Sequence, residues 1–330
     1  MGKGLTRVDR IVTLCMNPAL DITTGTEVVR PTDKLRCSTP RYDPGGGGIN
    51  VALVAQNLGA AAMAVFPAGG PAGELICNLL AAEGLASHRI SIGGCTRESL
   101  TVNEASTNRQ FRFVLPGPQL TVAEQTECLL QLRHAAAGAS IVVASGSLPP
   151  GVPPDFYQQV ANVCTELGVT FLLDTSGGGL THVNSGVFLL KPSVRELREC
   201  VGRALETEDE QLAAAGEFIE RGAARHLLVS LGAAGAMLVS RDRAQRFAAV
   251  PVTIPPGGSG VGAGDAMLAG VAVGLIRGWP VDEAARLGIA TGAATLLTPG
   301  TAPCTRADAE RLFLETEHPV DLDLVRSRDA

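Results

Sequence analysis

The sequence predicts an α/β protein: a doubly wound, mainly parallel sheet flanked by helices, with a small β-sheet as a lid. The main evidence is a series of short, almost wholly apolar runs, which are typical of strands buried on both faces of a sheet. Helical patterns separate these runs, and such alternation favours βαβ units. The expected strands cover residues 11–15, 141–144, 171–173, 187–190 and 227–229.

Two stretches between the expected strands show the spacing of helices. Val51, Val54, Ala55 and Leu58 recur at i, i+3, i+4 and i+7, so they share one face of a helix. Residues 122–137 form a second helical stretch. Both fit the crossover helices that connect the strands of a parallel sheet.

Two segments, 22–41 and 97–115, break this rhythm and read as exposed strands. In the second, Phe111, Phe113 and Leu115 alternate with Arg112, the period-two pattern of a sheet covered on one side only. Because each segment follows a strand of the main sheet, we expect the two to form one lid sheet over the ligand crevice. Two ordinary surface hairpins are the alternative.

This reading divides the chain into three parts. Residues 1–21, 42–96 and 116–316 would form the α/β domain, the two inserts would form the lid, and 317–330 would be a polar tail.

Composition excludes several classes of protein. Of 330 residues, 45% are hydrophobic and 18% are charged, which excludes a largely disordered chain. A net charge of -6 argues against a nucleic-acid binder, because such domains usually carry a concentrated basic face. No apolar run reaches the roughly 18 residues that span a bilayer, so we expect no membrane association. The 8 cysteines are scattered without a C-x-x-C pair, which indicates reduced thiols in a cytoplasmic protein.

Ligands of doubly wound sheets bind beyond the carboxyl ends of the strands. The residues directly after the apolar runs are therefore candidate site residues. Most of them are polar or small: Asn17, Gly146, Ser147, Asp174, Lys191, Ser230 and Gly232.

The glycine-rich segment 257–265 runs directly into an apolar helix. Glycines at a helix N-terminus let an anion approach the free amides and the positive end of the helix dipole. Asp265 would place a carboxylate beside that anion, where a base is needed if a hydroxyl attacks a phosphoryl group. The alternative is that Asp265 only caps the helix.

A second glycine cluster, 45–48, precedes the 51–58 helix in the same arrangement. Two anion-tolerant sites are more typical of a protein that transfers a group between two bound molecules than of a module that binds a single ligand. The sequence has no G-x-x-x-x-G-K-[ST] and no G-x-S-x-G, which argues against P-loop NTPases and nucleophile-elbow hydrolases. Gly258, Gly260 and Ala263 match a dinucleotide fingerprint, but too late in the chain for a nicotinamide oxidoreductase.

The order of these motifs resembles the PfkB-type carbohydrate kinases of the ribokinase superfamily over residues 10–313. Gly262-Ala263-Gly264-Asp265 is the most specific signature of that family. The resemblance is closest to the minor 6-phosphofructokinase branch, with 1-phosphofructokinases and tagatose-6-phosphate kinases as near relatives. The other matching segments are 17–21, 34–37, 45–50, 66–70, 145–151 and 230–235.

The resemblance implies an ATP-dependent hexose-phosphate kinase that converts fructose 6-phosphate into fructose 1,6-bisphosphate. Asp265 would be the general base, and the amides of Gly262, Ala263 and Gly264 would form the anion hole. The sugar phosphate would be held by Asp21, Lys34, Arg36, Gly46, Gly47, Asn50, Arg97 and Ser147.

The same resemblance implies the nucleotide and cation sites. ATP would bind through Lys191, Ser193, Ser230, Leu231, Gly232, Ala233, Ala234 and Gly235. Glu196 and Ser193 would organise Mg²⁺ through water. Backbone oxygens near Val261, Thr298, Gly300 and Ala302 would bind a monovalent cation such as K⁺.

One position departs from the family pattern. Ser193 stands where the family motif Asn-x-x-Glu has asparagine, and its shorter side chain would hold the magnesium shell or the phosphates less firmly. A sugar-phosphate or nucleotide sensor without turnover is therefore an alternative, although a sensor has no use for the Asp265 base. The apolar face of the lid is expected to pair with a second copy of the chain as a homodimer.

Overall fold

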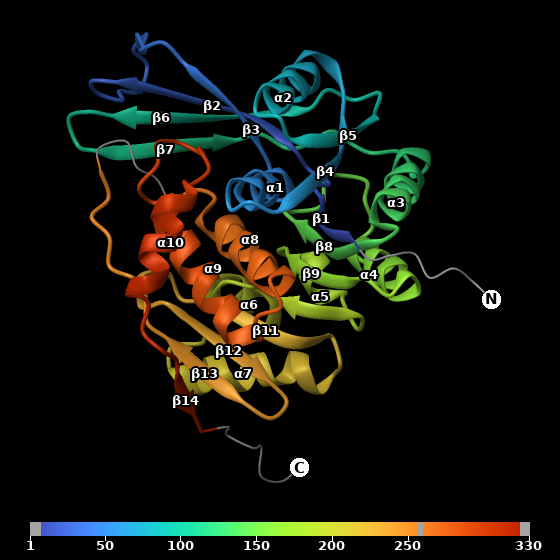
Figure 1. The fold of residues 1–330 in the computed structure, drawn as a ribbon. Coiled ribbons are helices and arrows are strands. Elements are labelled where there is room, and N and C mark those ends of the chain that lie inside the picture. The colour runs from blue at the N-terminus through green and yellow to red at the C-terminus, as the bar shows by residue number, and fades with distance from the viewer. Residues whose placement is uncertain (1–7, 256–259, 324–330) are drawn as a thin grey trace.

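The computed structural model describes residues 8–255 and 260–323, so Gly257, Gly258 and residues 324–330 lie outside the described part. In that part the main sheet has 10 strands in the order β14-β13-β12-β11-β10-β9-β8-β1-β4-β5 (Figure 1). The predicted α/β class is therefore confirmed. Seven of these strands are parallel: β1 (Val8–Leu14), β4 (Ala61–Ala68), β5 (Ala86–Ser91), β8 (Ala139–Ser145), β9 (Thr170–Asp174), β10 (Val187–Leu190) and β11 (Ala224–Ser230).

Three antiparallel strands extend the sheet beyond β11. They are β12 (Ala236–Ser240), β13 (Ala244–Phe247) and β14 (Val320–Leu322). The last strand lies within the stretch expected to be a polar tail. Only three residues long, it has too few positions to show an alternating pattern, so pairing with β13 could not be read from the sequence.

Alternate residues of the parallel strands pack on opposite faces of the sheet. Ile11 belongs to a core shared with α1 (Gly47–Asn57), α2 (Gly70–Ala82), α8 (Ala263–Ile276), α9 (Val281–Thr295) and α10 (Arg306–Glu315). Val12 faces a core shared with α3 (Val122–Ala136), α4 (Phe156–Leu167), α5 (Gly178–Thr181), α6 (Val194–Val201) and α7 (Glu208–Glu220). Both faces are covered, which explains why the strands read as continuous apolar runs.

The inserts form one separate sheet, and Figure 1 shows it at the top of the molecule. Its strands have the order β3-β2-β6-β7, with β2 (Ala19–Thr26), β3 (Arg41–Gly45), β6 (Arg97–Glu104) and β7 (Arg109–Val114). The strands reach from residue 19 to residue 45, beyond the expected insert 22–41. Leu115 follows β7, so it is not part of the strand face on which it was expected.

No helix of the described residues is long and apolar enough to cross a membrane. Strand β1 is parallel to both of its neighbours, β4 and β8, and the strands after β1 are added first on one side of it (β4, β5) and then on the other (β8, β9). In a doubly wound sheet this is the switch point where a crevice opens beyond the strand ends.

Candidate active site

The N-termini of two helices converge on Asp265 at this switch point. Ser145, the last residue of β8, donates its Oγ hydrogen to Asp265 Oδ1 over 2.8 Å. Asn50, in the first turn of α1, donates from Nδ2 to Asp265 Oδ2 over 2.9 Å. The carboxylate is thus fixed by side chains far away in the sequence and stands at the start of α8. This geometry favours a base over a helix cap, since the N-cap of α8 is Gly262, which has no side chain.

The second glycine cluster, residues 45–48, packs closely against the carboxylates of Asp21 and Asp265. A Cβ atom at Gly47 would lie 2.8 Å from Asp265 Oδ1 and 2.3 Å from Ser145 Oγ. A Cβ atom at Gly45 would lie 2.2 Å from Asp21 Oδ2. Only glycine fits these close approaches, so the cluster brings Asp21 of the lid and Asp265 of α8 to one crevice.

Several buried polar atoms without a hydrogen-bond partner belong to residues linked to Asp265 or to the lid strand that carries Asp21. Among the residues that the structure describes they include Asn17 Oδ1, Asp43 Oδ2, Asn50 Oδ1 and Arg97 Nε. Buried polar groups normally find partners, and unpaired ones indicate a missing ligand or water. A molecule with several hydroxyl groups fits this set of acceptors and donor.

Asp21 lies on a charged face of the lid sheet. It pairs in register with Asp43 on β3 and Ser99 on β6. Burial raises the pKa of the Asp21 carboxyl to about 6, while the positive charges of Arg112 and Arg97 oppose that rise. Two arginines therefore stand near this carboxylate, on a protein whose net charge is negative.

Arg97 joins the lid to the main sheet. It donates from one terminal nitrogen to the carbonyl of Asn17, over 3.1 Å, and from the other to the carbonyl of Leu115, over 3.3 Å. Asn17 in turn donates from Nδ2 to Ser147 Oγ over 3.2 Å. Ser147 is thereby tied to the end of β1.

Lys34 and Arg36 lie exposed on the connection between β2 and β3. Gly46 and Gly47 border the crevice at the start of α1, with Gly46 as its N-cap. The structure therefore brings Asp21, Gly46, Gly47, Asn50 and Arg97 together around the crevice, and places the two lid cations on an exposed edge.

A buried ion pair lies beside the expected anion hole. Lys191 Nζ and Asp174 Oδ2 are 2.8 Å apart, and Lys191 is only 3% exposed. Burial raises the pKa of Asp174 to about 6 against the attraction of Lys191. Burial alone would lower the pKa of Lys191, but the charges of Asp174, Asp265 and Glu196 outweigh it, so the pKa is raised and the ammonium stays charged. Lys191 Nζ lies 3.2 Å from where a Gly264 Cβ would be, so its charge faces the α8 N-terminus.

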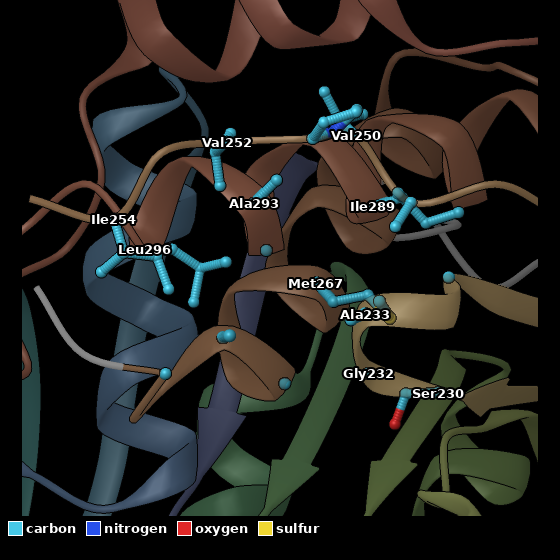
Figure 2. A pocket seen from close by; sticks show the side chains of 17 residues that line it. Ser230, Gly232, Ala233, Val250, Val252, Ile254, Met267, Ile289, Ala293 and Leu296 are labelled. Atoms are coloured by element: carbon cyan, nitrogen blue, oxygen red, sulfur yellow. The ribbon is translucent and has the colours of Figure 1, made fainter.

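A cavity of about 540 Å³ opens on the other side of Gly264 (Figure 2). Its lining includes four of the expected ATP residues, Ser230, Gly232, Ala233 and Gly235, together with Ala263 and Gly264. Leu231 and Ala234 line a neighbouring hollow that Ser193 also borders. The cavity size is in the usual range for small-molecule sites.

Arg246 of β13 fixes the turn that borders this cavity. Its guanidinium donates to the carbonyls of Ala234, Ala236 and Phe247 over 2.6, 3.0 and 3.2 Å. It also forms an ion pair of 2.9 Å with Glu208 at the start of α7. The turn is therefore held from outside the cavity.

Ser193 and Glu196 form a capping box at the start of α6. Glu196 Oε2 accepts hydrogen bonds from the amide and the hydroxyl of Ser193, and Ser193 Oγ accepts one from the Glu196 amide. The described residues contain no group of three or more His, Cys, Asp or Glu that could hold a metal ion.

The expected monovalent-cation segment is a tight turn. Thr298 donates its hydroxyl hydrogen to the carbonyls of Thr295 and Ala302, and the amide of Ala302 donates to the carbonyl of Pro299. The turn contacts the lid, since a Cβ at Gly300 would lie 3.4 Å from Thr23 Oγ1. Backbone carbonyls concentrated in such a turn suit K⁺.

Ser145 joins the site although sequence reasoning did not single it out, and it is the last residue of β8. Asp174, expected as a candidate because it ends an apolar run, is the last residue of β9 and pairs with Lys191. The partner of each residue depends on tertiary contacts that the sequence does not show.

The fold and site define a phosphotransferase of the α/β class that has no P-loop, with a carboxylate fixed by Ser145 and Asn50 at the start of α8. Comparisons with known proteins agree. The sequence model of the pfkB family carbohydrate kinases matches residues 14–308, and the chain belongs to that family.

Individual proteins are similar to this chain over most of its length. The chain is 59% identical to the ATP-dependent 6-phosphofructokinase isozyme 2 of Mycobacterium tuberculosis, over 95% of this chain and 91% of the relative. Phosphofructokinase-2 from Escherichia coli in complex with potassium superposes with a TM-score of 0.88 at 36% identity, over 93% of this chain and 99% of the other. The same enzyme in complex with fructose-6-phosphate gives a TM-score of 0.85 at 34% identity, with the same coverage.

Proposed function

We propose that the protein is an ATP-dependent 6-phosphofructokinase that converts fructose 6-phosphate into fructose 1,6-bisphosphate. The observation that carries this proposal is the convergence of two glycine-bordered helix N-termini on Asp265. One helix start borders the polar crevice and the other borders the nucleotide-sized cavity, so the carboxylate stands between an acceptor and a donor of a phosphoryl group.

Asp265 acts as the base. Its Oδ1 and Oδ2 are held by Ser145 and Asn50, so its remaining lone pairs are oriented toward the crevice. It accepts the proton of the sugar hydroxyl as that oxygen attacks the γ-phosphorus of ATP, and ADP departs on the opposite side. The amides of Gly262 and Gly264 and the ammonium of Lys191 would stabilise the negative charge of the transferred group, whereas the Ala263 amide donates to the Gly260 carbonyl over 3.4 Å.

Mg²⁺, when bound with ATP, neutralises phosphate charge. Glu196 would hold it through water, with Ser193 fixing that carboxylate and Asp174 adding negative charge nearby. The carbonyl-rich turn with Thr298, Gly300 and Ala302, together with Val261, would hold K⁺.

The charged lid face recognises the phosphate of the sugar. Arg97 is anchored at the hinge and Arg112 lies on the same face as Asp21, so both place positive charge near the Asp21 carboxylate and the sugar that it would bind. Lys34 and Arg36 stand exposed on the connection between β2 and β3 and would complete the phosphate site when it is occupied. Asp21, Asn50 and Ser147 would bind the sugar hydroxyls.

The opposite face of the lid supports a homodimer. One apolar row runs in register across all four strands and consists of Tyr42, Ile22, Leu100 and Phe113. Tyr42 is 43% exposed, Leu100 37% and Phe113 53%. An apolar row across a small exposed sheet marks an interface. The lid would then be a functional unit distinct from the α/β domain, and two subunits would share it.

An ADP-release assay tests the function. Fructose 6-phosphate should give the highest kcat/KM in a panel with fructose 1-phosphate, tagatose 6-phosphate and fructose. Arg97→Ala should raise KM for fructose 6-phosphate roughly 10-fold or more, as expected for a lost charge-assisted hydrogen bond, with KM for ATP nearly unchanged. Binding of both ligands without ADP release would indicate a sensor instead.

A further inference from the structure

A second cavity, of about 650 Å³, opens where three neighbouring parallel strands of the main sheet begin. Its lining includes the first two residues of each strand: Thr170 and Phe171 of β9, Val187 and Phe188 of β10, and Ala224 and Arg225 of β11. Asp174 is the last residue of β9 and Lys191 directly follows β10, so the active site lies at the other ends of these strands. The size of the second cavity is in the usual range for small-molecule sites.

Two arginines line the second cavity and stand side by side. Arg225 belongs to β11, and Arg241 directly follows β12. Because His226 and Ser240 pair in the antiparallel register of these strands, the next step of that register sets Arg241 opposite Arg225. Like charges at opposite positions destabilise a strand pair. Neither guanidinium forms an ion pair or a hydrogen bond with any residue that the structure describes, so their charges are not neutralised within the described part of the chain.

The surroundings of the two arginines add no negative charge to the cavity wall. Among the described residues that line the second cavity, only Arg225 and Arg241 are charged. The ring of His226 packs against Phe188, with 5.0 Å between the ring centroids. Burial and the positive charge of Arg225 lower the pKa of His226, which keeps this ring neutral near pH 7. The second cavity is therefore a positively charged hollow on a protein whose net charge is -6, and it suits an anion.

The rest of the wall is mainly apolar. Val169, Phe171 and Val187 are almost completely buried, and they form the deeper part of the lining. Phe188 and Ile219 also line the cavity and are only partly buried, so they present apolar surface to whatever binds there. An inorganic anion would leave this surface uncovered, whereas an apolar group attached to the anion would remove it from water.

We propose that the second cavity is a binding site for a small organic phosphate with an apolar body, held through Arg225 and Arg241. The planar guanidinium group matches the oxygens of a phosphate, and a phosphate dianion neutralises two arginines where a carboxylate neutralises one. The apolar body lies on Phe188 and Ile219. The site does not depend on the proposed kinase activity, because none of its described lining residues lines the nucleotide cavity.

Calorimetric titration of the full chain with phenyl phosphate tests the site, because this probe joins a phosphate to an apolar ring. Fructose 6-phosphate is present throughout at saturation, so that the proposed sugar site is filled. We expect phenyl phosphate to bind with a Kd roughly 10-fold or more below that of inorganic phosphate, since the ring covers apolar surface. Phenol, which has the ring without the charge, should give no measurable heat. Equal affinities for the two phosphates, or no binding of phenyl phosphate, would overturn the proposal.

Arginine substitutions assign the binding to the second cavity. Arg225→Gln and Arg241→Gln should each raise the Kd of phenyl phosphate about 10-fold or more, the effect of a lost charge-assisted hydrogen bond. Both side chains are exposed, so these changes carry little risk to folding. Arg198→Gln on α6 is the matched control and should leave the Kd unchanged, because Arg198 is exposed as well and does not line the cavity. Unchanged binding by both cavity variants, or an equal loss in the Arg198 variant, would overturn the proposal.

Discussion

Asp265→Asn is the most informative substitution, because the structure separates its effect on catalysis from its effect on folding. The asparagine Oδ1 can still accept the hydrogen bond from Ser145. Its Nδ2 would meet Asn50 Nδ2, two donors at 2.9 Å, but Asn50 can rotate its amide because its own Oδ1 has no partner. Folding and ligand binding should therefore be nearly preserved.

The rate should fall because the amide cannot accept the proton of the sugar hydroxyl. The loss of a general base predicts a decrease in kcat of roughly 10²- to 10⁴-fold, or about 2.7 to 5.4 kcal/mol in the activation free energy. KM for both substrates should change little. Initial rates of ADP release at saturating ATP and fructose 6-phosphate measure this directly.

Asp155→Asn is the control, since this exposed carboxylate at the N-cap of α4 makes no side-chain capping hydrogen bond, and the change should leave kcat unchanged. Thermal unfolding of both variants should stay within a few degrees of the unmodified protein. A folded Asp265→Asn variant with near-normal kcat would refute the base assignment and return Asp265 to a structural role.

Three further outcomes follow from the site. KM for fructose 6-phosphate should rise as the pH falls through about 6, because protonation of Asp21 removes an acceptor for sugar hydroxyls. If the Asp21→Asn variant kept the same inflection in its pH profile of KM, Asp21 would not be the titrating group. Ser193→Asn should lower the free Mg²⁺ needed for half-maximal rate, and since asparagine also caps helices, α6 should stay intact; an equal or higher requirement in a magnesium titration would refute it. Arg246→Met should raise KM for ATP about 10-fold without changing KM for the sugar, because the turn loses its hydrogen bonds. Arg243→Met is the control and should leave KM for ATP unchanged, since Arg243 pairs with Asp282 and Asp321; equal effects of the two variants would argue against a role of Arg246 in holding the turn.

The parallel sheet could be predicted from the sequence because both of its faces are buried, which leaves continuous apolar runs. The lid strand β7 could be predicted from the alternation of Phe111, Arg112 and Phe113, but the expected cover on one side is wrong for this strand, of which only Phe111 is partly buried. The start of β2 at Ala19 was missed because Ala19 and Leu20 are buried and continue the pattern of the main sheet. Strand β14 was missed because three polar and apolar residues at a chain end carry no periodic signal.

At the site, motifs identified single residues but not their partners. Glycine clusters and Asp265 were readable because anion binding demands particular residues next to a helix start. The bond from Ser145 to Asp265 joins residues 120 positions apart, and no spacing rule relates them. The capping box explains Glu196 by local chemistry, so its role toward Mg²⁺ stays a prediction for the titration above.

We propose that Asp265 stands between a sugar site and a nucleotide site and acts as the base while a phosphoryl group passes directly from ATP to the sugar. The most direct test is ³¹P NMR of a reaction with ATP, Mg²⁺ and fructose 6-phosphate. We expect fructose 1,6-bisphosphate and ADP in equal amounts, with neither formed by Asp265→Asn on the same time scale. ADP with inorganic phosphate and no bisphosphate, or no ADP at all, would contradict it.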